Sequence, residues 1–339
     1  MKQKSKSLSL SVHGINIKVN SDNPYLIDYI KEYYKPFVSS QKKYDLKVYI
    51  IFKKYLSKPS KNFGGKTTIG DKNTIDENTN TLFYKEGELN ISVKRGNFLE
   101  VKTEFRPHNQ RHILHLGLFG PRKVKLYYYR KIMKYSIHDP LFYLLETRYG
   151  IDVLHASAVE KNNFAIVFTG LGGAGKSSLV TELISKKGYK LVSDNYLLFK
   201  KDFCYPFPER LRVKKESLSL SDTKTIKADG NKYYLDTGKT DISKKKIGAV
   251  IIVTRGKKYK LTKVTPENAF DKLFMIGEFT SEFHYHEYIS LLSYLHKKIN
   301  TTKKRTDRLY EFTKTVKIYT LTVTPNITVD TKKILSKIK

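Results

Sequence analysis

The chain has 339 residues, of which 40% are hydrophobic and 13% aromatic, enough to build one large or two ordinary globular domains. Its 64 lysines and arginines against 32 acidic residues give a formal charge of +32, which favours anionic partners such as nucleotides, RNA or acidic proteins. The single cysteine, Cys204, excludes an intrachain disulfide framework and a metal site built from thiolates alone.

The N-terminal stretch "MKQKSKSLSLSVHGINI" alternates polar and apolar residues and has no apolar core of signal-peptide length. The longest apolar runs, such as 248–253, have the length of a strand and are far too short to span a bilayer. The sequence therefore predicts a soluble, cytoplasmic protein without a membrane partner.

Strand patterns dominate the first 150 residues. Residues 7–19 alternate like a hairpin, a helix is expected to begin near Ser21 or Asp22, and the aperiodic, Gly- and Asn-containing stretch 56–80 predicts a mobile loop. Further strands are expected at 46–52, 81–85, 89–94, 98–105, 112–118 and 124–130, followed by a helix over 139–150. We place a domain junction there, which separates a strand-rich α+β domain (1–150) from a second domain (151–339).

Basic residues concentrate in three stretches, 101–137, 244–263 and 297–317. The first contains Arg122, Lys123, Lys125 and Arg130, and is a candidate RNA-binding surface. The tyrosines at 127–129 fit a strand that is half core and half surface better than a base-stacking platform. A lysine-rich composition that reflects genome bias explains the charge equally well.

A phosphate-binding motif lies in the second domain. Gly170, Gly175, Lys176 and Ser177 fit G-x-x-x-x-G-K-[ST], after the strand-like run 164–168 and before a helix that Gly188 should stop. Such a loop offers backbone N–H groups and a helix N-terminus to phosphates, a lysine to the β- and γ-phosphates, and a hydroxyl to Mg²⁺. The residues assigned to binding of ATP are Gly170, Gly172, Gly173, Ala174, Gly175, Lys176, Ser177 and Ser178.

Two further residues are expected near this loop. Asp194 follows the strand pattern 189–193, and a right-handed crossover would make that strand parallel to 164–168, with Asp194 on the phosphate side as a general base, a metal ligand or a turn residue. If Asn162 and Asn163 form a hairpin turn, His155 falls opposite Gly170, beside the loop, in a structural or a functional role.

These segments together resemble the P-loop kinases related to HPr kinase/phosphorylase, which share a nucleotide-binding core with phosphoenolpyruvate carboxykinases. The resemblance covers about 138–215 and rests on "LHASAVE", a strand, "GLGGAGKSS", a helix, "GYKLVSDN" and "YPFPERLRV". It implies an α/β fold with that core, ATP and Mg²⁺ bound by Lys176 and Ser177, Asp194 as general base and as Mg²⁺ ligand, and His155 assisting at the phosphate.

The chain departs from that family in two places. Asn195 stands where the family often has a second acid, and the late Gly-Arg-Asn stretch of HPr kinase proper is missing, so the resemblance is to a divergent relative. Arg210 and Arg212 are either substrate contacts or solvated strand residues. Beyond them the sequence predicts a core strand around 246–256, helices at 266–275, 281–298 and 304–313, and a strand over 316–323.

The sequence thus predicts an ATP-dependent kinase whose acceptor is a hydroxyl, serine-type by resemblance, on a peptide, protein or small molecule. A second interpretation is a kinase that phosphorylates RNA. A nucleotide-binding, RNA-associated regulator without catalysis is a third, since Asn195 removes a charge from the site.

Overall fold

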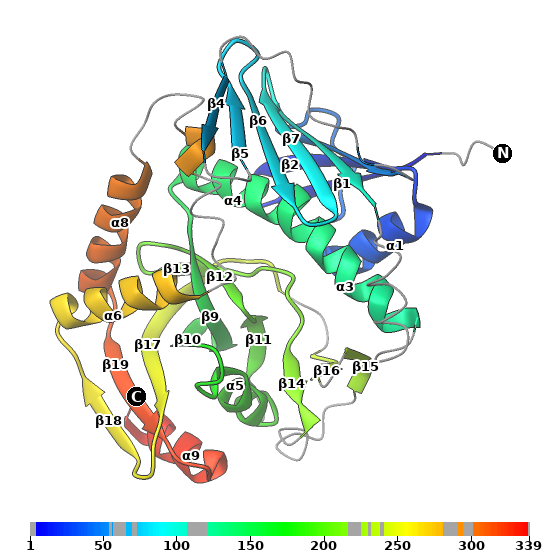
Figure 1. Ribbon diagram of the computed structural model, residues 1–339. Coiled ribbons are helices and arrows are strands. Elements are labelled where there is room, and N and C mark those ends of the chain that lie inside the picture. Colours follow the sequence, from blue (N-terminus) through cyan, green and yellow to red (C-terminus); the bar gives the residue numbers. More distant parts are fainter. Residues whose placement is uncertain are drawn as a thin grey trace. The chain divides into compact units, whose positions relative to one another are not determined.

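The computed structural model describes residues 5–53, 56, 66–69, 73–106, 121–186, 188–215, 225–229, 232–237, 241–280, 290–293 and 301–337. The chain divides into two compact units, residues 1–149 with 285–301 and residues 150–284 with 302–339. Each is a mixture of helices and strands, so the fold is mixed α/β (Figure 1). None of the helices in the described ranges is long and apolar enough to cross a membrane.

The first unit contains an eight-stranded mixed sheet. Three central strands, β2, β3 and β8, are parallel, and the remaining neighbours are antiparallel. In sheet order the strands are β1 (Lys6–Val12), β2 (Ile15–Ser21), β3 (Leu46–Phe52), β8 (Leu99–Phe105), β7 (Leu89–Arg95), β6 (Thr81–Glu86), β5 (Asn73–Asp76) and β4 (Lys66–Ile69). Buried residues alternate with half-exposed ones along β2, so one face of the sheet supplies the core.

Several local predictions for this unit are confirmed. The 7–19 hairpin turns at His13 and Gly14, which both have positive φ. The N-cap of helix α1 (Pro24–Tyr33) lies one or two residues later than Ser21 or Asp22, at Asn23, whose side chain accepts the N–H groups of Tyr25 and Leu26.

Two predictions for this unit are wrong, and a third lies outside the described residues. The expected strand at 124–130 is part of helix α3 (Pro121–Met133), whose buried Leu126, Tyr129 and Met133 follow helical spacing. The expected loop at 56–80 includes β4 and β5, which pair with one another. The expected strand at 112–118 is not in the described ranges.

The helical segment after α3 continues to the end of the first unit. A π-helical turn (Lys134–His138) is followed by α4 (Asp139–Leu144) and a second π-helical turn (Leu145–Tyr149). Gly150 then has a φ of 61°, a left-handed conformation suited to ending a helix, as the sequence predicted. A short 3₁₀ helix, η1 (Lys35–Phe37), follows α1.

The second unit contains another eight-stranded sheet. Pairing of β10 with β17 closes a ring of five strands, and β19 and β18 extend the sheet from β17. Its strands are β9 (Asp152–Lys161), β10 (Phe164–Thr169), β11 (Lys190–Ser193), β12 (Tyr196–Lys200), β13 (Phe203–Tyr205), β17 (Lys245–Arg255), β18 (Lys260–Lys263) and β19 (Ile318–Val323). Strands β10, β17 and β19 are parallel, so their carboxyl ends lie at one edge.

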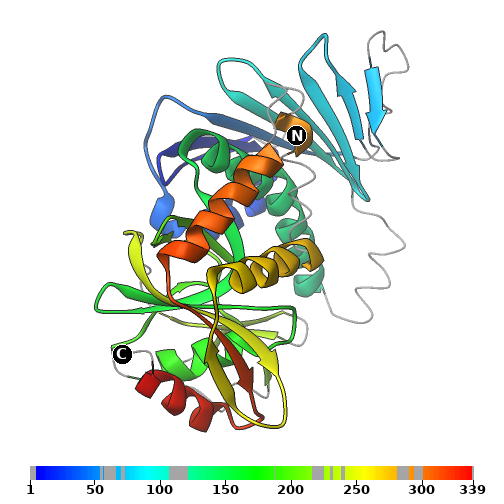
Figure 2. The same ribbon diagram turned by 90° about the vertical axis from the view of Figure 1, so that its left-hand side faces the viewer.

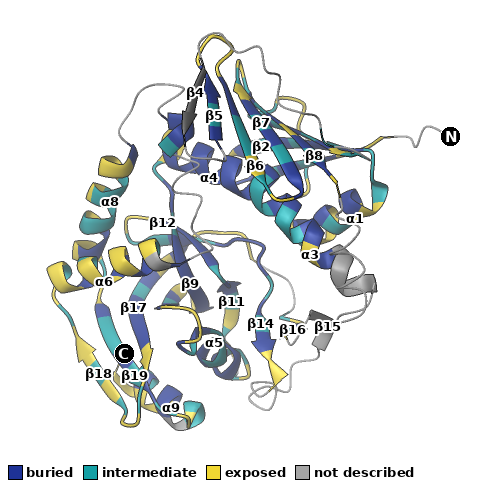
Figure 3. Ribbon diagram, viewed as in Figure 1, coloured by how far each residue is buried: buried dark blue, intermediate teal, exposed yellow. Residues whose placement is uncertain are grey.

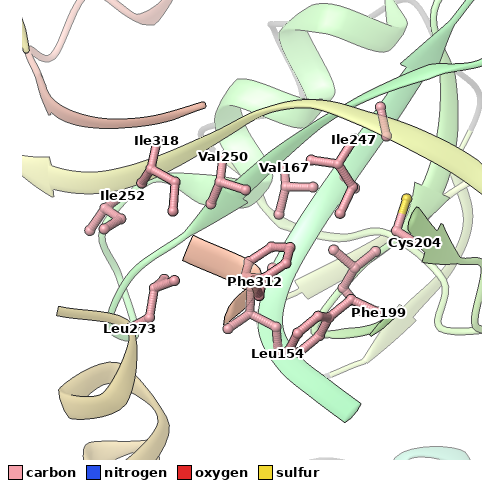
Figure 4. Packing of buried hydrophobic residues seen from close by; sticks show 14 of the residues in the cluster. Leu154, Val167, Phe199, Cys204, Ile247, Val250, Ile252, Leu273, Phe312 and Ile318 are labelled. Atoms are coloured by element: carbon pink, nitrogen blue, oxygen red, sulfur yellow. The ribbon is translucent and has the colours of Figure 1, made fainter. Parts of the chain in front are cut away.

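Helices cover both faces of this sheet (Figure 2). One face packs against α6 (Pro266–Phe279) and α8 (Thr301–Thr315), where the ring of Phe312 packs at a tilt against that of Phe199, with 4.5 Å between the ring centroids (Figure 4). The other face packs against α5 (Lys176–Ile184) and α9 (Ile327–Lys337) through Leu179, Leu183 and Ile334. Strands β9 and β17 are therefore buried over most of their length, whereas the edge strand β18 is largely exposed (Figure 3).

A three-stranded antiparallel sheet completes the second unit and was not predicted from the sequence. Its strands are β14 (Arg212–Lys214), β16 (Lys232–Leu235) and β15 (Thr225–Asp229). Val213 and Leu235 join the core beside α5 and so tie the small sheet to the large one. Of the expected helix at 281–298, the structure describes only residues 290–293, and these are helical.

Candidate functional site

The hairpin that carries the site has the predicted register. Asn162 and Asn163 both have positive φ, at 53° and 66°, and Lys161 pairs with Phe164. Strand β9 therefore runs antiparallel to β10, and Thr169 at the end of β10 donates to the carbonyl oxygen of His155 at 2.8 Å. His155 thus lies beside the start of the glycine loop.

Glycine is favoured at three positions of the loop between β10 and α5, because Gly170, Gly173 and Gly175 all have a positive φ. Gly170 has a φ of 146°, and a Cβ there would lie 2.5 Å from the carbonyl oxygen of Val253. Gly175 has a φ of 104° and is the last residue before α5. The first N–H groups of α5 have no partner within the helix, which makes its start suitable for an anion.

The side chain of Lys176 folds back over the loop. Its Nζ donates to the carbonyl oxygens of Gly170 at 2.7 Å and Leu171 at 3.2 Å, and the residue is buried. Polar carbonyl groups therefore hold the ammonium group at the mouth of the loop, where an incoming phosphate can take their place. Ser178 lies on the same first turn of α5 and is half-buried, and Ala174 packs into the core.

The carboxylate of Asp194 is the centre of a buried hydrogen-bond network. Its Oδ1 accepts from the hydroxyls of Ser157 and, at 3.3 Å, of Ser177. Its Oδ2 accepts from the backbone N–H of Arg212 at 3.2 Å. Segments β9, α5 and β14 thus meet at one acid that is 3% exposed.

The distance between Ser177 and Asp194 fits a shared magnesium ion. Mg²⁺ holds oxygen ligands at about 2.1 Å in an octahedron, so two adjacent ligands lie about 3 Å apart. The 3.3 Å between Ser177 Oγ and Asp194 Oδ1 is close to that value. The described residues contain no group of three or more His, Cys, Asp or Glu side chains that could hold a metal alone. Nucleotide phosphates would supply further ligands, as is usual for Mg²⁺.

The sheet brings Asp194 to the loop by a route that differs from the expected one. Strand β11 does run in the direction of β10, but β9 lies between them, antiparallel to both. The parallel neighbour of β10 is β17, which ends at Thr254 and Arg255 without an acid. The acid at this site, Asp194, is therefore positioned by β11, on the side of β9 opposite to β10.

His155 is a neutral imidazole at pH 7. Burial, with a smaller contribution from the charge of Lys176, lowers its pKa to about 3. The ring hydrogen bonds with the backbone of Asn195. A neutral imidazole can orient neighbouring groups by hydrogen bonding, but it supplies no positive charge to a phosphate.

Asn195 has a structural reason for its identity. Its φ is 67°, in the left-handed region where asparagine is enriched among residues other than glycine. The chain turns there from β11 into β12, which pairs with β9 from Tyr196 onward. Asn195 is half-exposed, whereas Asp194 points into the network.

The two arginines of "PERLR" are placed differently. Arg212 contributes its backbone N–H to Asp194, and its guanidinium lies 3.4 Å from the buried Glu209. Arg210 is half-exposed. Sequence reasoning considered only the arginine side chains and did not identify the backbone contact, which depends on the start of β14 lying beside Asp194.

Ser157 is the other residue that sequence reasoning missed. It occupies the middle of "HASAV", and the one sequence signal for its role was a hydroxyl among small apolar residues in a buried strand.

The candidate RNA-binding residues lie in the first unit. The side chains of Arg122, Lys123 and Lys125 are outside the described set, and Arg130 is half-buried on α3.

Comparison with known proteins gives no assignment. No protein-family model matches the chain. No curated protein matches it either. The functional conclusion therefore depends on the site.

Proposed function

We propose that this chain is an ATP-dependent kinase that transfers the γ-phosphoryl group to a hydroxyl on a peptide, protein or small molecule. The observation that carries the proposal is the pairing of Ser177 with Asp194 at the mouth of a glycine loop, at a separation suited to a shared Mg²⁺. The resemblance of 138–215 to kinases related to HPr kinase/phosphorylase supports the same class and favours a serine-type acceptor.

The loop and Lys176 bind the nucleotide in this proposal. N–H groups at the start of α5 receive the phosphate oxygens, and Lys176 leaves the carbonyls of Gly170 and Leu171 to bind the β- and γ-phosphates. When bound, Mg²⁺ neutralises phosphate charge that builds up during transfer. Ser177 and Oδ1 of Asp194 would hold it.

The two carboxylate oxygens of Asp194 have different roles in this proposal. Oδ1 faces Ser177 on the nucleotide side, and Oδ2 faces the start of β14 and keeps a lone pair for the acceptor. The acceptor oxygen bonds to the γ-phosphorus as the bond to the β–γ bridging oxygen breaks. ADP leaves with that electron pair, and the acceptor proton passes to Asp194. Neutral His155 orients the Asn195 turn.

Radiolabelled ATP tests the proposal. Purified full-length protein should release ADP from γ-labelled ATP in a Mg²⁺-dependent reaction and label a hydroxyl when offered serine peptides, polyols and RNA in parallel. Lys176→Met keeps the buried stem but removes the charge, so turnover should fall at least a hundredfold. Lys190→Met, at an exposed lysine on β11, is the matched control and should stay at the wild-type rate.

Circular dichroism must show both variants folded, because Lys176 is buried and its loss could also destabilise the loop. Wild-type turnover in the folded Lys176 variant would refute the kinase. Label in RNA alone would change the acceptor class, and nucleotide binding without any turnover would favour a regulator.

A further inference from the structure

The hydroxyl of Ser157 has no packing reason to be present. The residue lies in the middle of β9, 1% exposed, between Ala156 and Ala158 and opposite Phe168 of β10. Alanine would fill nearly the same space, as it does at both neighbouring positions. A buried hydroxyl must find a hydrogen-bond partner, and this one donates to Oδ1 of Asp194.

The three donors to Asp194 differ in what a bound cation would do to them. Ser177 must turn an oxygen lone pair to Mg²⁺, so the direction of its O–H bond, and with it the hydrogen bond to Asp194, changes when the cation binds. The N–H of Arg212 holds the other oxygen, Oδ2. The Ser157 hydroxyl comes from the rigid core strand, holds Oδ1, and is not itself a ligand. Its bond can persist unchanged when the cation arrives.

We propose that Ser157 is a positioning residue that holds Oδ1 of Asp194 toward Ser177 and so prepares the Mg²⁺ site before the metal–nucleotide complex binds. The inference rests on the proposed function, since it assigns Ser157 a role at that same site. Neighbours that orient a metal ligand commonly change metal affinity by tenfold to a hundredfold when removed.

A purely structural role makes a different prediction. If Ser157 only satisfies its own hydroxyl, its removal changes stability but affects nucleotide binding equally with and without metal. If it positions Asp194, the loss is confined to the metal-dependent part of binding. The two roles are separated by titrating metal at fixed nucleotide.

The experiment measures binding of a fluorescent ATP analogue, mant-ATP, to the full chain in EDTA and at increasing MgCl₂, alongside urea unfolding. Ser157→Ala should raise the MgCl₂ midpoint about tenfold and leave affinity in EDTA within about twofold. Ser157→Thr keeps the hydroxyl on a residue that suits a strand, and should restore the midpoint to within about threefold. Ser136→Ala is the matched control, because Ser136 is also a buried serine and its hydroxyl shares a hydrogen bond of 2.8 Å with that of Thr103 in the first unit.

An unchanged MgCl₂ midpoint in Ser157→Ala, or an equal loss of affinity with and without metal, would overturn the inference while leaving the kinase proposal intact. Ser157→Cys, with a weaker donor of similar size, takes the place of the alanine variant if that does not fold. Wild-type protein that binds no mant-ATP under any condition would instead refute the proposed function, and the inference with it.

Discussion

Two buried aspartates, one in each unit, show what separates a structural acid from a candidate site. Asp139 in the first unit is 2% exposed and pairs with Lys134 at 3.3 Å. Asp194 in the second unit is 3% exposed and accepts from two hydroxyls and a backbone N–H. Among the residues that the structure describes, Asp194 forms no ion pair.

The difference is one of charge balance. A carboxylate beside a lysine already has its counter-charge, and adding a second cation gains little. Neutral donors hold the carboxylate of Asp194 in place but leave its negative charge uncompensated. Such an acid attracts a cation from outside the protein, and a glycine loop that suits phosphates lies next to it. The following predictions test this comparison.

The largest expected effect is on catalysis by Asp194→Asn. The amide keeps the shape but cannot accept the acceptor's proton, so phosphoryl transfer should fall by about a hundredfold or more, with mant-ATP binding in EDTA still measurable. Asp139→Asn should leave turnover unchanged and lower the free energy of unfolding by about 2 kcal/mol, because a charged hydrogen bond is lost. A fully active Asp194→Asn variant would show that Asp194, like Asp139, has only a structural role.

The second prediction concerns two glycines of the loop. A Cβ at Gly170 meets the carbonyl oxygen of Val253 at 2.5 Å, whereas a Cβ at Gly172 meets nothing within 4 Å. Gly170→Ala should therefore displace the loop from β17, lower the free energy of unfolding by roughly 2 kcal/mol and abolish tight nucleotide binding. Gly172→Ala, the control for crowding, should leave the free energy of unfolding unchanged. Urea unfolding and mant-ATP titration measure both, and equal behaviour of the two variants would contradict the close approach.

The smallest expected effect is a pH dependence of stability that comes from one buried histidine in each unit. Burial lowers the pKa of His138 in the first unit to about 3, with Lys134 as the second cause, and lowers the pKa of His155 to about 3. Unfolding releases each to an ordinary pKa near 6.5, so the unfolded chain binds more protons below that pH. Each histidine's contribution is present above pH 6.5 and is lost as the pH falls toward 3.

The loss should amount to about 2 kcal/mol per histidine at pH 5. His138→Phe and His155→Phe should each flatten the difference between pH 7 and pH 5 in their own unit, as followed by hydrogen exchange of that unit's amides. Only His155→Phe should also reduce turnover, and by less than Asp194→Asn. Unchanged pH dependence in either variant would mean that the imidazole is accessible to protons in the folded state.

Local patterns in the sequence were sufficient for the hairpin and for the strand, glycine loop and helix. Asn162 and Asn163 tolerate positive φ, so the turn and register of β9 and β10 followed from two residues. The 124–130 segment was mistaken for a strand because "VKLYYYR" is rich in β-formers. Its place in a long helix depends on Leu126, Tyr129 and Met133 packing into the core.

The sequence by itself determined which groups stand beside the glycine loop along the chain, because glycine, lysine and serine at fixed spacing have conformational and chemical properties that need no context. The tertiary structure decided how Asp194 reaches them. The Arg212 N–H and the Ser157 hydroxyl come from residues 18 and 37 positions away from Asp194 in the chain. Strand β9, which is inserted between β10 and β11, is similarly distant in sequence. Pairing at such distances depends on which strands share a sheet, and no local propensity encodes that choice.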